Sequence, residues 1–236
     1  KVILNPYSNR WNSQKRWPDV EAALKAAGVD FDLVVSQKKG QIVELAERAV
    51  HEDCSPIIVA GGDGSIGDAA NGLMRAAQSR TGQMVPLGIM PTGSANDLVY
   101  ALGLPTDLKE AARVIAAGKT RQMDVGKLND HYFVNNSAAG LEPYVTIKHE
   151  KIHWIKGIFR YLVAAVQAIL DKPEWEANVK WDDKEFKGKI SMISIGNGRR
   201  TGGFFMTPHA DLFDGRHATA FLGTTAFVPG RFNIWG

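Results

Sequence analysis

The sequence has little of several features that would point to a particular class of protein. Cys54 is the only cysteine, so no disulfide framework can form and a reducing, cytoplasmic setting is expected. The net charge of +3, with no long run of lysine or arginine, argues against nucleic acid as a partner. The longest apolar stretch, at 162–170, is far too short to span a bilayer. At 44% hydrophobic over 236 residues, the chain is expected to be globular, with one large core or two modest ones.

The most informative segment is 57–65, where an apolar run ends in three glycines interrupted by one aspartate. The run predicts a buried strand, and the glycines allow a sharp turn whose amide groups can bind phosphate oxygens. Asp63 fits such a turn if a cation lies between it and a phosphate, or if it takes a proton from an attacking hydroxyl. The segment therefore indicates phosphoryl transfer, and an ordinary tight turn is the alternative interpretation.

Two common nucleotide-binding loops do not fit this segment. Gly62, Gly64 and Gly67 spell G-x-G-x-x-G, but the next expected strand, 85–90, ends without the acid that a dinucleotide fingerprint requires. The Walker A loop requires Gly-Lys-Ser/Thr, and this turn contains no lysine.

Strand and helix patterns alternate in the first half of the chain. This alternation predicts a parallel sheet with helices on both faces, with ligands bound beyond the carboxyl ends of the strands. The turns at Asn5, Ser36, Gly62 and Pro91 lie at those ends. Strands are expected at 2–4, 31–35, 57–60 and 85–90, and helices at 18–24, 42–49, 66–77, 98–102 and 108–117.

The pattern changes after residue 122. Strands are expected at 123–128 and 131–135, joined by Asn129-Asp130, and at 177–181 and 189–195, joined by a polar turn. A helix is expected over 154–171. We therefore predict an α/β domain at 1–122 and a mainly antiparallel domain at 123–236.

A second motif supports the first. Residues 91–97 follow the strand at 85–90 and open a helix, whose N-terminal amide groups can bind an anion together with the hydroxyl of Ser94. Asp97 lies in the first helical turn, where it could also serve only as a cap. Two glycine–acid turns at neighbouring strand ends favour a shared site.

Together these motifs resemble the diacylglycerol kinase catalytic domain, and most strongly the soluble bacterial diacylglycerol kinases and related lipid kinases. The resemblance implies an α/β nucleotide-binding domain and a β-sandwich lipid-substrate domain, with the active site in the cleft between them. It is carried by Asn5-Pro6-x-Ser8, 61–65 with 71–73, 91–97 with 101–105, 124–126, 133–135, 196–203, Pro208-x-Ala210 and Asp214-Gly215.

The resemblance implies a role for each matched position. The catalytic acids would be Asp63, acting with Mg²⁺ at the phosphoryl-transfer centre, and Asp97 and Asp124, contacting metal or acceptor hydroxyl. A structural Mg²⁺ would lie near Asp214, with the backbone of Asp211 and Arg216 as further ligands. The nucleotide contacts would be Asn5, Pro6, Tyr7, Ser8, Asn9, Ser36, Gly62, Asp63, Gly64, Ser65, Ile66, Gly67, Asp68, Gly93 and Ser94.

The sequence departs from the family pattern at several positions. Asn9 stands where glycine is usual, Asp68 replaces a glutamate, and Phe213 replaces an acid beside the structural metal, which weakens that assignment. The printed sequence contains no Asp-Gly-Glu, the motif that carries the family's general base. We therefore expect either that the chain is incomplete at its C-terminal end or that it binds nucleotide and turns over poorly.

The predicted function is that of an ATP- and Mg²⁺-dependent lipid kinase, with diacylglycerol as the leading acceptor. Such an enzyme would be cytoplasmic and peripheral at the membrane surface, and a homodimer is an open possibility. The alternatives are a kinase of soluble substrates, similar to NAD kinase or phosphofructokinase, and a nucleotide-binding protein without kinase activity. Arg199-Arg200, in a glycine-rich loop, would either meet anionic headgroups or solvate the loop.

Overall fold

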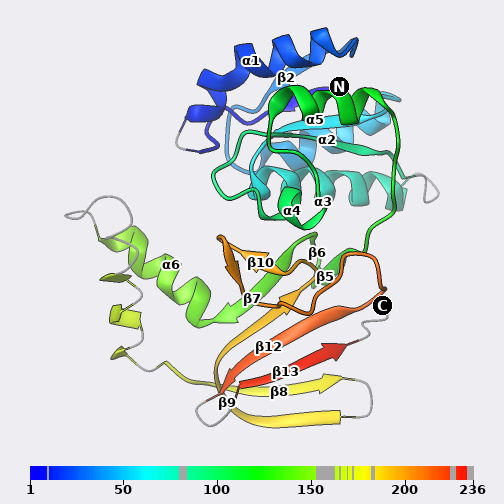
Figure 1. Cartoon of the computed structure of the whole chain (residues 1–236). Coiled ribbons are helices and arrows are strands. Elements are labelled where there is room, and N and C mark those ends of the chain that lie inside the picture. The colour runs from blue at the N-terminus through cyan, green and yellow to red at the C-terminus, as the bar shows by residue number, and fades with distance from the viewer. Residues whose placement is uncertain are drawn as a thin grey trace. The chain divides into compact units, whose positions relative to one another are not determined.

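The chain folds into two compact units. The computed structural model describes residues 1–9, 11–79, 84–152, 163–164, 166–168, 170–171, 173–181, 184–223 and 227–232. Unit 1 comprises Lys1–Asn135 together with Arg200–Phe204, and unit 2 comprises Asn136–Arg199 together with Phe205–Gly236. Figure 1 labels the elements in chain order.

Unit 1 is built on a four-stranded parallel sheet, which confirms the predicted architecture. Its spatial order is β2-β1-β3-β4, so the first strand lies inside the sheet and the connection from β2 to β3 passes over β1. The strands are short and apolar, and every residue of the two central strands is buried, as expected for a sheet covered on both faces. The strands are β1 (Val2–Leu4), β2 (Leu33–Val35), β3 (Ile57–Gly61) and β4 (Leu87–Pro91).

Helices cover both faces of this sheet (Figure 1). Successive strand residues point to opposite faces, and one set, which includes Leu4, Ile58 and Met90, packs against Leu24 of α1 and Ala112 of α5. On the other face α2 and α3 pack on each other and on β1 and β3. The helices of unit 1 are α1 (Asn12–Ala26), α2 (Gln41–His51), α3 (Asp63–Ser79), α4 (Asp97–Ala101) and α5 (Leu108–Ala116).

The first helix begins earlier than the sequence predicts. The expected start at Pro18 was wrong: α1 begins at Asn12, and Pro18 lies inside the helix. The amides of Asn12 and Ser13 donate to the carbonyls of Asn9 and Ser8, at 3.1 and 3.2 Å, so the preceding loop satisfies the first turn. Proline is favoured in the first turn of a helix but can also lie further inside one, and tertiary packing decides where α1 begins.

A hairpin extends unit 1 beyond the boundary predicted at 122–123. It consists of β5 (Gly126–Leu128) and β6 (His131–Phe133), which pair antiparallel as predicted. The side-chain Nδ2 of buried Asn71 in α3 donates to the Tyr132 carbonyl at 2.7 Å, and its Oδ1 accepts from the Tyr132 backbone amide at 2.8 Å. These two hydrogen bonds hold the hairpin against α3, so the first compact unit runs to Asn135.

Unit 2 contains an antiparallel sheet, as the second half of the sequence predicts. Its order is β13-β12-β9-β7, with β8 also paired to β9. The helix α6 (Leu141–Lys151) was not predicted, and the helix predicted over 154–171 lies largely outside the described residues. The strands are β7 (Asn136–Gly140), β8 (Trp175–Trp181), β9 (Lys184–Gly196), β12 (His217–Gly223) and β13 (Phe227–Phe232). The short β10 (Arg200–Thr201) and β11 (Phe204–Phe205) form a separate hairpin, most of which belongs to unit 1.

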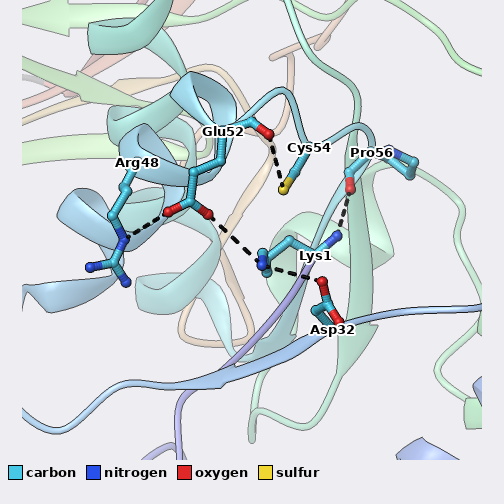
Figure 2. Close-up of polar contacts among 6 residues, drawn as sticks. All are labelled: Lys1, Asp32, Arg48, Glu52, Cys54 and Pro56. Atoms are coloured by element: carbon cyan, nitrogen blue, oxygen red, sulfur yellow. Dashed lines mark hydrogen bonds and ion pairs between the residues drawn. The ribbon is translucent and has the colours of Figure 1, made fainter.

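Charged contacts lie at the amino ends of the parallel strands, which is the edge opposite the glycine turns. Figure 2 shows these contacts around Lys1. The Lys1 ammonium lies 3.5 Å from the Asp32 carboxylate and 3.9 Å from that of Glu52. Cys54, the single cysteine, donates weakly to the Glu52 carbonyl at 3.9 Å. This edge therefore serves to tie strand starts together. In the part of the chain that the structure describes, no helix combines the length and apolar character needed to cross a membrane.

Candidate active site

Three loops meet at the carboxyl edge of the parallel sheet, where the sequence places the site. The amide of Asn5, just after β1, donates to the carbonyl of Ala60 in β3 at 3.0 Å. The amide of Thr92, just after β4, donates to the carbonyl of Gly61 at 3.0 Å. The loops after β1, β3 and β4 are therefore joined side by side.

The first loop is held to the start of α3. The side-chain amide of Asn5 donates to the Ser65 hydroxyl at 2.8 Å, and the Tyr7 amide donates back to the Asn5 side chain at 3.1 Å. The Tyr7 hydroxyl reaches the Gln37 carbonyl at 2.8 Å, beside buried Ser36. Asn9 has φ of 51°, in the left-handed region that asparagine tolerates better than most residues. This conformation explains why asparagine can stand where the family usually has glycine.

The two glycine turns contact each other through their backbones. A Cβ atom added to Gly93 would lie 2.4 Å from the Gly62 Cα, and one added to Gly62 would lie 2.9 Å from the Gly93 Cα. No side chain other than hydrogen fits at either position without a shift of the backbone. The amide groups of both turns and of the N-terminus of α3 consequently lie in one small region, which suits an anion.

Asp63 is the first residue of α3, so β3 passes directly into a helix. The Asp63 side chain is partly exposed, and its Oδ1 accepts from the Leu98 amide at 2.9 Å, which ties the first glycine turn to the start of α4. Its Oδ2 makes no hydrogen bond or ion pair to the residues that the structure describes. One carboxylate oxygen thus has a structural role and the other can meet a ligand.

Asp97 lies in a different environment. The residue is only 2% exposed, and its two carboxylate oxygens accept from the Gly203 amide at 3.1 and 3.2 Å. The Arg200 Nε lies 3.5 Å from Oδ1. Asn96 occupies the N-cap position of α4 but makes no capping hydrogen bond, and its side-chain amide donates instead to the Gly93 carbonyl at 3.2 Å. Asp97 is therefore not merely a helix cap, because it binds a loop from a distant part of the chain.

The paired arginines have different partners in the structure. The Arg199 Nε donates to the Ala210 carbonyl at 2.9 Å, inside unit 2. The Arg200 guanidinium lies in unit 1, next to Asp97 and 4.2 Å above the centre of the Tyr100 ring. Sequence reasoning missed this cluster because Gly203 and Asp97 are 106 positions apart and no local pattern links them.

Asp68, the aspartate that replaces the family's usual glutamate, is half-buried on α3. Burial raises the pKa of its carboxyl above the ordinary value of 3.8, while the positive charges of His131 and Lys39 lower it in part. Asp68 is therefore partly shielded from water and lies near His131 and Lys39. Asp124, the third predicted catalytic acid, lies half-buried between α5 and β5.

The predicted structural metal ligands lie in unit 2 and form local turns. The Asp211 carboxylate accepts from the Phe213 amide at 3.1 Å, and the Asp214 carboxylate accepts from the Arg216 amide at 3.0 Å. Both geometries are those of Asx turns, which need no metal. Across the described ranges, no three His, Cys, Asp or Glu side chains gather as a metal site. The structural-metal assignment remains a prediction from the resemblance.

A nucleotide-bound Mg²⁺ is compatible with the carboxyl edge of the sheet. Magnesium in such sites is held by one or two carboxylates, several waters and the phosphates, so a cluster of three acids is not required. Asp63, with one oxygen directed away from its structural hydrogen bond, offers that single carboxylate beside the amide-rich turns. The residues present therefore fit the ion.

The fold matches that of solved kinases. A crystal structure of a diacylglycerol kinase from Bacillus anthracis strain Sterne superposes with a TM-score of 0.71 at 22% identity, covering 95% of this chain and 73% of that one. A second crystal structure of a candidate diacylglycerol kinase from the same strain superposes with a TM-score of 0.78 at 22% identity, covering 98% of this chain and 83% of that one. These likenesses establish a shared fold.

Sequence comparison establishes the family. The model of the diacylglycerol kinase catalytic domain matches residues 1–128, and the chain belongs to this family. A diacylglycerol kinase of Staphylococcus carnosus is 30% identical over 217 residues, which cover 91% of this chain and 69% of that relative. A diacylglycerol kinase of Staphylococcus aureus is also 30% identical over 217 residues, covering 67% of its length. The predicted family is confirmed.

Proposed function

We propose that the chain is a diacylglycerol kinase, which transfers the γ-phosphoryl group of ATP to the hydroxyl of diacylglycerol. Membership of the family supports an ATP-dependent lipid kinase. The observation that carries the proposal is the position of Asp63, which follows the carboxyl end of β3 and is adjacent to Gly62, the residue that contacts the second glycine turn at Gly93. Because diacylglycerol resides in a bilayer, the enzyme would act at a membrane surface. The predicted homodimer stays a prediction.

The nucleotide would lie across the three joined loops. Backbone amides of the Gly62 and Gly93 turns, with the N-terminus of α3, would bind the phosphates. The loop at residues 5–9 and Ser36 would hold the rest of the nucleotide, and the exposed hydroxyl of Ser94 would add a donor. The hydrogen bonds of Asn5 and Tyr7 fix this surface before the ligand arrives, which lowers the entropic cost of binding.

Asp63 would hold the Mg²⁺ of the nucleotide through its Oδ2, and the ion would neutralise charge on the phosphates. Asp97 would contribute a fixed negative charge behind this centre, because both of its oxygens are already bound. Asp124 would be a further acid of the site. Catalysis by these residues would consist of positioning and electrostatic stabilisation during in-line transfer, without a covalent enzyme intermediate.

An acceptor screen tests this proposal. The full-length protein would be incubated with γ-labelled ATP and Mg²⁺ in the presence of diacylglycerol-containing phospholipid vesicles, vesicles without diacylglycerol, NAD or fructose phosphate. We expect label in a lipid product only when diacylglycerol is present. Transfer to NAD or fructose phosphate with none to lipid would favour a soluble-substrate kinase. Nucleotide binding without transfer to any acceptor would favour a binding protein, and either result would overturn the proposal.

A further inference from the structure

The loop 200–204 belongs to the compact unit that contains the candidate active site, although it comes from the second half of the chain. Gly202 and Gly203 have φ of 59° and 88°, in the left-handed region that favours glycine. This conformation directs the Gly203 amide to the Asp97 carboxylate, at 3.1 and 3.2 Å. The loop therefore reaches α4 through a backbone donor and through Arg200.

Asp97 requires such partners. A carboxylate that is 2% exposed loses nearly all of its hydration, and an unpaired buried charge is strongly destabilising. The Gly203 amide supplies a hydrogen bond and the Arg200 guanidinium, with Nε 3.5 Å from Oδ1, supplies the opposite charge. Asp97 is thereby fixed in one orientation.

Arg200 is itself held on two further sides. Its guanidinium lies 4.2 Å above the centre of the Tyr100 ring, a cation–π geometry on the same short helix that begins at Asp97. Its carbonyl accepts from the Asn135 side-chain amide at 2.8 Å. The arginine side chain is 20% exposed, so it is an ordered part of the site rather than a solvated loop charge.

The orientation of Asp97 affects Asp63 through the peptide bond between Asp97 and Leu98. Leu98 follows Asp97 directly, and its amide donates to Oδ1 of Asp63 at 2.9 Å. Fixing Asp97 therefore fixes the donor that orients the Asp63 carboxylate. A displacement of this donor would turn the Asp63 Oδ2 away from its position, and catalytic geometry tolerates little misplacement.

We propose that Arg200 is a positioning residue of the phosphoryl-transfer site, acting on Asp63 through Asp97 and the Leu98 amide. This inference rests on the proposed function. A positioning role for Arg200 differs from a purely structural role in one measurable respect. A structural arginine would set the fraction of folded protein, whereas a positioning arginine sets kcat for each molecule that binds nucleotide.

The test compares Arg200→Gln and Arg200→Lys with Arg199→Gln. Arg199 is the matched control because it is the adjacent arginine and its Nε bonds the Ala210 carbonyl in unit 2. Rates of label transfer to diacylglycerol vesicles would be divided by the number of nucleotide-binding sites measured in the same sample. We expect Arg200→Gln to lower kcat about 10- to 100-fold with KM for ATP changed much less, as for other residues that orient a ligand group. Arg200→Lys should recover part of the rate.

A double-mutant comparison with Asp97 provides a second test. In an Asp97→Asn background, Arg200→Gln should cost far less than in the wild type, because the charge it orients has been removed. Equal rates per nucleotide-binding site in Arg200→Gln and Arg199→Gln would overturn the role of Arg200, as would independent effects of Arg200 and Asp97. If Arg200→Gln does not fold, the Arg200→Lys rate decides: an unchanged kcat overturns the inference. An inactive full-length wild type would instead remove the proposed function, and the role of Arg200 with it.

Discussion

The two glycine–acid turns look alike in the sequence and differ in the structure. Both follow a parallel strand, both place a glycine against the other turn, and both put an aspartate at the start of a helix. Asp63 is partly exposed and uses one oxygen to accept from the Leu98 amide. Asp97 is buried and gives both oxygens to the loop 200–204.

This difference separates two roles for the same residue type. An acid that keeps an oxygen available can meet a cation or a substrate, and an acid whose oxygens are bound can only orient its neighbours and contribute its charge. Since Asp97 and Leu98 are adjacent, the buried acid supports the accessible one. The following predictions test this division, from the largest expected effect to the smallest.

Asp63→Asn should produce the largest effect. The asparagine oxygen can still accept from the Leu98 amide, so the fold should be retained, while the negative charge proposed to hold the ion of the nucleotide is lost. We expect kcat for lipid phosphorylation to fall by about 10²–10³-fold, the usual consequence of removing one electrostatic stabiliser. Urea unfolding should give a midpoint close to that of the wild type. A rate near the parental value would show that Asp63 is not the accessible acid.

Gly93→Ala should disturb the contact between the two turns. The added methyl would lie 2.4 Å from the Gly62 Cα and 2.6 Å from the Asn96 Oδ1, so the backbone must move. Overpacking of this kind costs about 1–3 kcal/mol of unfolding free energy, and the rate should fall with it. The measurement is the urea midpoint together with kcat.

Gly64→Ala is the matched control for that change. Gly64 lies in the first turn of α3, and a Cβ added there meets nothing within 4 Å. Replacing glycine by alanine in a helix stabilises by up to about 1 kcal/mol. A Gly93→Ala protein as stable as Gly64→Ala would contradict the close contact between the turns.

Asp68→Asn should have the smallest effect, visible as a pH dependence. Burial raises the pKa of Asp68 in the folded protein above 3.8, so the folded state binds more protons than the unfolded state as pH rises from that value. The carboxylate therefore lowers stability increasingly as pH rises through this window. The advantage of Asp68→Asn in thermal midpoint should be absent below about pH 3.8 and should grow towards neutral pH. An advantage that shrinks with rising pH would contradict the burial of Asp68.

Much of this arrangement follows from the sequence. The alternation of apolar strands with amphipathic helices predicts the parallel sheet, and the rule that ligands bind at strand carboxyl ends places the glycine turns together. The Asn129-Asp130 hairpin was also predicted, and Asn129 has φ of 54° as such a turn requires. Local chemistry fixes these features, which is why they could be predicted.

The features that were missed depend on tertiary contacts. The cluster of Arg200, Tyr100 and Asp97 joins segments far apart in the chain, and its arginine looks like any loop cation in the sequence. The early start of α1 depends on carbonyls of the preceding loop that accept from its first turn. The lipid-kinase prediction was confirmed at the level of the family by its motifs rather than by any single residue.

Calorimetric titration of ADP into the wild type and Asp63→Asn, each with and without Mg²⁺, tests the central claim most directly. If Asp63 holds the ion of the nucleotide, Mg²⁺ should tighten ADP binding by the wild type and should have little effect on Asp63→Asn. ADP affinity without Mg²⁺ should be similar for both, or slightly higher for the variant, because the carboxylate repels the phosphates. The same Mg²⁺-dependent tightening in both proteins would contradict the account.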